Sequence, residues 1–206
     1  MSTFSVVRRG LRGAAMGAVA LGACGAVLAD PAHAASSATF AMKRSTGLPA
    51  TCAPNARATV KVQSVGFAEK MTVTVSGLKK GTALDLFAIQ VPNFPFGLGW
   101  YVGDLEVGDS GQVSKTFVSR FNVETFAVAV GAAPAPVEHP GDATTNPAFK
   151  PVHTYHLGAW FNSPADAAKN GCATTVTPFN GEHNAGIQVL STNGFADLKG
   201  PLSKID

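Results

Sequence analysis

Charged residues are scarce in this chain of 206 residues: Asp, Glu, Lys and Arg together make up 14% of it, against about 25% in an average soluble domain. Because hydrophobic residues make up 46%, the composition excludes an intrinsically disordered chain, which needs high charge and few apolar residues. The sequence also lacks a second uncharged apolar stretch of about 20 residues beyond the N-terminal one, so we expect no membrane span elsewhere.

The N-terminus has the three parts of a secretory signal peptide. Three arginines precede an uncharged stretch over residues 13–29, and an Ala-x-Ala cleavage site ends at Ala34. We therefore expect a leader over 1–34 that is cleaved after Ala34, and a secreted mature chain over 35–206 that forms a single domain. The general and the twin-arginine export routes both stay open.

An alternative cleavage site lies before Cys24. The three residues that precede it, Leu-Gly-Ala, are similar to the lipobox of bacterial lipoproteins, whose cysteine carries the lipid anchor. Either cleavage leaves Cys52 and Cys172 able to pair in an oxidising compartment. We expect this pair to form a structural disulfide, because the chain has no C-x-x-C spacing typical of a redox centre.

Net charge limits the partners. Removal of residues 1–34 takes away three arginines and one aspartate, so the formal net charge falls from +3 to +1. A near-neutral chain predicts no nucleic-acid partner and no polybasic patch for anionic lipid.

Hydrophobic periodicity predicts an all-β protein. Residues 57–63 alternate apolar and polar side chains, and residues 70–76 repeat the pattern, as expected of half-buried strands. Further strands are expected over 83–91, 99–107, 113–119, 123–130, 152–161 and 187–190. Eight or nine short strands separated by turns predict a single antiparallel β-sandwich of immunoglobulin-like or fibronectin-like type.

Two segments depart from the strand pattern. Ser163, Pro164 and Asp166 fit a helix N-terminus, with Ser163 as the cap, and predict one short helix over 163–170. Residues 131–151 are rich in Pro and Ala and predict a long loop.

Four aromatic residues surround a proline-rich turn: Phe94, Phe96, Trp100 and Tyr101. If they are exposed, they could stack on a sugar or an apolar ligand, as in a carbohydrate-binding module. If they are buried, they close one end of the sandwich core. The sequence leaves both interpretations open.

Histidines give a second candidate site. His156, Glu182 and His183 could form a three-ligand Zn or Cu site, or a small-ligand pocket with acid–base groups. The alternative is that His156 is a hydrogen-bonded histidine of the sheet and that His183 lies in a structured turn within residues 180–186. Our first expectation is a protein without a cofactor.

Catalytic motifs are weak. An Asp-Ser-Gly turn at 109–111 lacks an upstream histidine in the mature chain, so it does not predict a serine protease. Asp104 and Glu106 share one face of an expected strand and could act as paired carboxylates, although exposed charges are usual on edge strands. We assign no catalytic residue and favour a protein that is not an enzyme.

The runs over 87–97, 156–164 and 181–189, with Trp100-Tyr101, resemble a group of uncharacterised secreted proteins of high-GC Gram-positive bacteria. The resemblance implies secretion and assigns no activity or site residue. We therefore expect a non-catalytic extracellular or cell-envelope protein that binds an unknown extracellular ligand or envelope component. A metal or small-ligand protein and a carbohydrate-binding module are the alternatives.

Overall fold

The computed structural model describes four segments of the chain, at residues 36–122, 125–127, 152–178 and 180–205. All of them belong to one compact unit that spans His33–Asp206. The expected leader with its cleavage sites at Ala34 and Cys24, and the expected loop over 131–151, lie outside the described residues.

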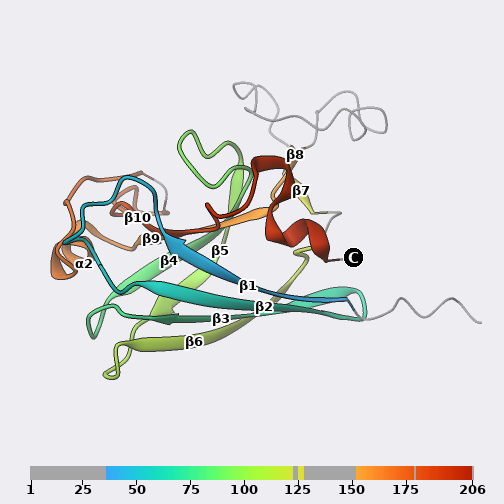
Figure 1. Cartoon of the computed structure of the whole chain (residues 1–206), viewed down its shortest axis with the longest axis horizontal. Helices are drawn as coiled ribbons and strands as arrows, with labels where there is room; N and C mark the ends of the chain where they lie inside the picture. The colour runs from blue at the N-terminus through green and yellow to red at the C-terminus, as the bar shows by residue number, and fades with distance from the viewer. Residues whose placement is uncertain (1–35, 123–124, 128–151, 179, 206) are drawn as a thin grey trace, which may run out of the picture. The chain divides into compact units, whose positions relative to one another are not determined.

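An antiparallel sheet of eight strands is the main element of this unit (Figure 1). Its strands are β1 (Ser37–Arg44), β2 (Arg57–Val65), β3 (Ala68–Ser76), β4 (Ala83–Ile89), β5 (Gly99–Glu106), β6 (Gln112–Ser119), β9 (His156–Phe161) and β10 (Gln188–Ser191). Their order across the sheet is β5-β4-β9-β10-β1-β2-β3-β6. Two short strands, β7 (Phe126–Ala127) and β8 (Val152–His153), form a separate pair.

Strand β1 joins the two halves of the sheet. Residues 37–42 pair with β2, whereas Lys43 and Arg44 pair with β10. The sheet curves so far that its two edge strands contact each other, and the ring of Phe117 on β6 lies against Gly103 on β5. The expected antiparallel all-β fold is confirmed. The expected division into two sheets of an immunoglobulin-like sandwich is not confirmed, because one continuous and nearly closed sheet takes its place.

The inner face of this curved sheet holds the main hydrophobic core. In β2 and β3 every second residue is buried, as the two-residue period predicts. The largest fully buried side chains are Trp160, Phe121, Phe161, Met42, Met71, Leu84, Leu86, Ile89, Leu105, Leu157, Leu190 and Leu202. Strand β4 is buried on both of its faces, in keeping with its nearly uniform apolar sequence.

The helix and the disulfide form as the sequence predicts. Helix α2 (Pro164–Lys169) begins after Ser163, whose hydroxyl accepts a hydrogen bond from the backbone N–H of Asp166 at 3.1 Å. Cys52 and Cys172 form a disulfide that ties the loop after β1 to the segment after α2. Two 3₁₀ helices, η1 (Asp197–Lys199) and η2 (Pro201–Lys204), follow β10. Within the described segments, no helix is long and apolar enough to cross a membrane.

Loss of the disulfide should lower stability strongly. The bond closes a loop of 120 residues, for which the loss of chain entropy predicts a stabilisation of about 4–5 kcal/mol. We expect the urea midpoint of the wild type to fall on reduction, to that of the double variant Cys52→Ser, Cys172→Ser. The double variant is the control, since reductant should leave it unchanged. An unchanged wild-type midpoint after verified reduction would contradict this expectation.

Candidate functional site

The outer face of strands β5, β4 and β9 carries a group of polar and aromatic side chains beneath a loop. Along β4 the side chains alternate: Leu84, Leu86 and Ala88 belong to the main core, whereas Phe87 and Ile89 belong to a second, smaller cluster. Asp85 lies on the same outer face as this second cluster by the two-residue period of a strand. The candidate site therefore lies on this face.

A β-bulge brings Tyr101 and Asp104 to the same face. Three residues apart on a regular strand, they would point to opposite sides of the sheet. The register shifts between Leu86 and Phe87, however, so that Asp104 pairs with Asp85 and Tyr101 pairs with Phe87. The extra residue on β5 lets the Tyr101 hydroxyl donate a hydrogen bond to Asp104.

Asp85 is a buried carboxyl group next to a second carboxyl group. It is 1% exposed, and it lies opposite Asp104 on one side and opposite Trp160 on the other. Its Oδ2 atom is a buried side-chain oxygen with no hydrogen-bond partner within the described residues. An unpaired buried acceptor is costly, and it is costlier when the group is charged.

The two neighbouring carboxyl groups differ in exposure, because Asp85 is buried and Asp104 is exposed. Burial, followed by the charge of Asp104, raises the pKa of Asp85 from 3.8 to about 6, and the Asn180 amide partly opposes that shift. Burial and the hydrogen bond to Asp104 also raise the pKa of Tyr101. A protonated Asp85 and the Tyr101 hydroxyl can therefore both donate a hydrogen bond to Asp104, which is exposed.

The loop over 180–186 lies at the edge of this site and makes hydrogen bonds within itself and to the end of β9. Asn180 Oδ1 accepts from the backbone N–H of Asn184 at 3.0 Å, and Asn180 Nδ2 donates to the Asn162 carbonyl at 3.1 Å. His183 has a left-handed backbone with φ of 57°. The structured turn that we considered for this segment is therefore what forms. Glu182 is close enough for its charge to raise the pKa of Asp85.

Aromatic rings continue the site across the outer face. They form a row of edge-to-face contacts, with ring centroids 5.0–5.9 Å apart, in the order Phe94, Phe96, Trp160, Phe87 and Tyr101. The two ends of the row are open to solvent: Phe94 is 85% exposed and Tyr101 is 49% exposed. The middle of the row is a small hydrophobic cluster, which gives the two exposed rings a rigid base.

Trp100 does not join the other three aromatic residues of the expected patch. Its ring stacks on Phe121 with centroids 5.6 Å apart, and its Nε1–H donates to the Thr154 hydroxyl at 3.3 Å. It packs against the main core. The expected patch is therefore divided: Phe94, Phe96 and Tyr101 face outward, whereas Trp100 serves the core.

His156 lies away from Glu182 and His183. His156 is the first residue of β9. The 180–186 loop lies at the other end of that strand, because the Gly186 N–H donates to the carbonyl of Phe161, the last residue of β9, at 2.7 Å. Five residues of strand separate these positions by about 16 Å. The structure thus does not bring together the three side chains that we considered as metal ligands.

Both ring nitrogens of His156 are also occupied. Nδ1 lies 2.9 Å from the Thr192 hydroxyl and Nε2 lies 3.0 Å from the Asp197 carbonyl. Because a carbonyl can only accept, Nε2 donates. Burial lowers the pKa of His156, which favours the neutral ring. His156 is a hydrogen-bonded histidine of the sheet, as our alternative interpretation had it. Among the described residues, no group of three His, Cys, Asp or Glu side chains is arranged to hold a metal ion.

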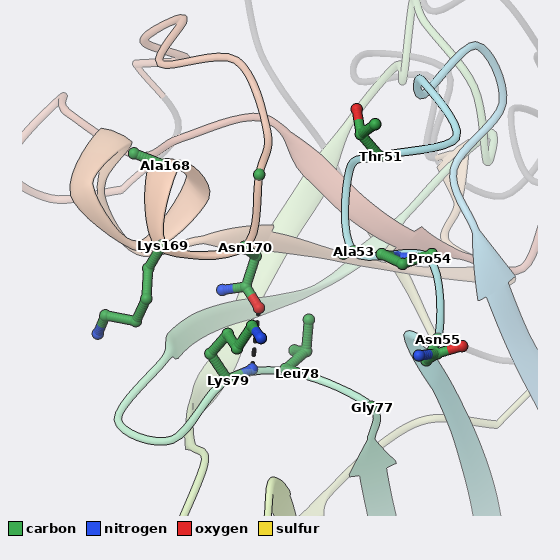
Figure 2. A pocket seen from close by; sticks show the side chains of 11 residues that line it. Thr51, Ala53, Pro54, Asn55, Gly77, Leu78, Lys79, Ala168, Lys169 and Asn170 are labelled. Carbon is green, nitrogen blue, oxygen red and sulfur yellow. Dashed lines mark hydrogen bonds between the residues drawn. The ribbon is translucent and has the colours of Figure 1, made fainter.

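A hollow of about 610 Å³ beside the disulfide is a second place where a ligand could fit (Figure 2). It is lined by Thr51, Ala53, Pro54, Asn55, Gly77, Leu78, Lys79, Ala168, Lys169, Asn170 and Gly171. Its central amide, Asn170, is engaged by the backbone, because Oδ1 accepts from the Lys79 N–H at 2.9 Å. Lys169 Nζ donates to the Gly81 carbonyl at 2.6 Å and extends away from Thr51 in Figure 2. These groups connect parts of the fold, so we place the candidate site on the outer face.

Sequence reasoning missed the central residue of this site. Asp104 was considered, but with Glu106 as its partner, since only neighbours on one strand can be paired from sequence. Asp85 belongs to a strand 19 residues earlier and meets Asp104 only through the register of β4 and β5. Its one signal was a charged residue inside an otherwise apolar run, because a buried polar residue is the informative exception.

The pH dependence of the free energy of unfolding should reveal the proton that Asp85 keeps in the folded protein. In the folded protein Asp85 keeps its proton up to about pH 6, whereas in the unfolded chain it loses it near 3.8. Between these values the folded state binds more protons, so this group lowers the free energy of unfolding as pH rises. Asp85→Asn removes this effect. Its stability relative to wild type should rise between about pH 4 and about pH 7.5, by at most about 3 kcal/mol.

Urea unfolding at several pH values measures this effect. Asp109→Asn is a matched control, because Asp109 is an exposed aspartate that pairs with Lys80 outside the site. The control should follow the wild-type pH dependence. If Asp85→Asn also runs parallel to wild type across this range, Asp85 is not the buried acid described above.

The chain was also compared with known proteins. No protein family, no curated protein and no solved structure matches it. The functional argument therefore depends on the chemistry of the outer face itself: an exposed carboxylate, a half-exposed tyrosine hydrogen bonded to it, and a row of aromatic rings.

Proposed function

We propose that this is a secreted, non-catalytic carbohydrate-binding protein whose ligand lies on the outer face of β5, β4 and β9. The ligand contacts Tyr101 and Asp104 at one end of the aromatic row and Phe94 at the other. Asn184, which is exposed on the 180–186 loop, supplies an amide at the rim. The partner is an extracellular glycan or a polysaccharide of the cell envelope.

The observation that carries the proposal is the pairing of Tyr101 with Asp104. Sugars present apolar C–H faces and hydroxyl donors together, so their sites combine an aromatic ring with fixed polar acceptors. Tyr101 offers its ring at 49% exposure while its hydroxyl holds the neighbouring carboxylate in one place. Preorganised groups of this kind lose little entropy when a ligand binds.

The same carboxyl pair argues against glycoside hydrolysis. The two carboxyl groups of a glycosidase flank the bond that is cleaved and stand at least about 5 Å apart. Here Asp85 is buried and interacts directly with Asp104 through a side-chain hydrogen bond, so only Asp104 can reach a ligand from this pair. In this pair, Asp85 helps to hold the exposed carboxylate of Asp104 in position.

Secretion is part of the proposal. The disulfide between Cys52 and Cys172 is buried and intramolecular, and such bonds persist in oxidising compartments. Together with the leader expected over 1–34, this supports export of the chain. A binding protein for envelope or extracellular glycans would work on that side of the membrane.

Binding to polysaccharides tests the function. We expect the protein to be retained by at least one of insoluble cellulose, chitin, xylan and purified peptidoglycan. Tyr101→Ala removes the stacking ring and Asp104→Asn weakens the acceptor. Each should reduce binding by roughly tenfold, the effect of about 1.4 kcal/mol. Depletion from solution at increasing polysaccharide concentration gives the dissociation constants.

Asp109→Asn is the control for Asp104→Asn, since both remove one exposed aspartate from a turn or strand of the same unit. It should bind as the wild type does. Retention on no polysaccharide, or equal retention of wild type and both site variants, would overturn the proposal. Release of reducing sugar that Asp104→Asn abolishes would replace binding by hydrolysis.

A further inference from the structure

Among the described residues, the most exposed large hydrophobic side chain lies at the turn between β2 and β3, outside the aromatic row. Phe67 is 94% exposed there, and Val65 beside it is 50% exposed. The turn has only two central residues, of which Gly66 takes a positive φ of 71° while Phe67 does not. A tight turn of this kind makes the phenylalanine project from the end of a long hairpin.

Neighbouring side chains extend this apolar surface and add positive charge. Val118 on β6 is 66% exposed and pairs with Lys70 of β3. Arg120 follows β6, and its guanidinium donates to the Phe67 carbonyl at 2.8 Å, so it lies directly beside the turn. We call Val65, Phe67 and Val118 the apolar tip; Lys70 and Arg120 flank it.

Charges are segregated between the two halves of the sheet. Strands β1, β2, β3 and β6 carry six basic residues and one acidic residue. The acidic one, Glu69, is buried: its carboxylate accepts from the Phe121 N–H at 2.6 Å and lies 4.0 Å from the Arg120 guanidinium, which is itself partly exposed. Strands β4 and β5 carry three acidic residues and no basic one. The half that ends in the apolar tip is therefore the basic half, although the net charge of the chain is small.

The N-terminal segment reaches the sheet at the same end. The Ser36 carbonyl accepts from the Ser64 N–H at 2.9 Å, next to the β2–β3 turn. If the leader is cleaved after Ala34, the new α-amino charge is one residue away from Ser36. If Cys24 is lipidated instead, the acyl chains are joined to this end by eleven residues.

We propose that the apolar tip docks on an anionic lipid surface, with Phe67 inserted at the headgroup boundary and Lys70 and Arg120 against the headgroups. A projecting aromatic ring between cations is the composition that interfacial binding needs, since burial of apolar area and attraction to anionic lipid add. This proposal does not depend on the carbohydrate site.

Vesicle binding tests it with the protein as recovered from cells that express the full chain. We expect co-sedimentation with vesicles of phosphatidylcholine and phosphatidylglycerol, weaker binding to phosphatidylcholine alone, and release by salt. Phe67→Ser should weaken binding by about tenfold or more. Lys70→Gln should weaken it only on the anionic vesicles. In Phe67→Trp, the emission maximum should move to shorter wavelength when vesicles are added.

The chain offers matched controls. Phe94→Ser removes another highly exposed phenylalanine, from the turn between β4 and β5, and should leave vesicle binding unchanged. Lys80→Gln removes an exposed lysine from the turn that follows the opposite end of β3 and should do the same. Polysaccharide retention of Phe67→Ser should equal that of wild type, which separates this proposal from the carbohydrate one.

Three outcomes would overturn the proposal. The first is wild-type protein that does not bind anionic vesicles. The second is equal binding by wild type and Phe67→Ser, or equal loss in Phe67→Ser and Phe94→Ser. The third is a concentration-dependent dimer of the wild type that Phe67→Ser abolishes and vesicles do not affect, since the tip would then be a contact between two copies of the chain.

Discussion

The hydrogen bonding of β1 to two different neighbours is the constraint on which the rest of the structure depends. Six residues of β1 pair with β2 and the last two pair with β10, so that one strand carries the sheet around its bend. A sheet that curves this far encloses its apolar side chains on the inside and brings its edges together. Phe117 of one edge strand then packs against Gly103 of the other, where a β-carbon would come within 2.5 Å of the ring.

This closure also shapes the outer face. The bulge next to Gly103 shifts the register of β5 by one residue, and that shift puts Tyr101 and Asp104 on one side of the sheet. A buried carboxyl with an unpaired oxygen lies underneath them. Such a group lowers the stability of the folded state when it is charged. Destabilising groups of this kind often occur at functional sites. The composition of the site thus depends on a local irregularity in the pairing of β4 with β5.

The two proposals use different halves of the sheet. The acidic half, with β4 and β5, offers an exposed carboxylate and aromatic rings to a neutral, hydroxyl-rich ligand. The basic half ends in the apolar tip, which suits an anionic surface. A net charge near zero concealed this arrangement, because a sum over the sequence contains no information about where the charges lie. Our expectation that the chain has no basic patch for anionic lipid considered only that sum.

Local patterns were sufficient for much of the fold. The period of β2 and β3, the cap at Ser163 and the pairing of the two remaining cysteines all follow from interactions between near neighbours or from simple exclusion. Strand β1 was not predicted, because its alternation is imperfect: Ala41 lies among the exposed residues that alternate with Ala38, Phe40 and Met42. The curvature that replaced a sandwich depends on β1 pairing with both β2 and β10, which no local pattern contains.

Only part of the candidate site could be predicted from the sequence. The sequence by itself determined which residues were aromatic, acidic or able to turn, and it identified Tyr101, Phe94 and Glu182 as worth following. Only the tertiary structure decided that Asp85 is the partner of Asp104, that Trp100 faces the core, and that His156 lies about 16 Å along its strand from the loop with His183. Those outcomes depend on strand register and on which face a bulge exposes, and both are set by contacts between residues far apart in the chain.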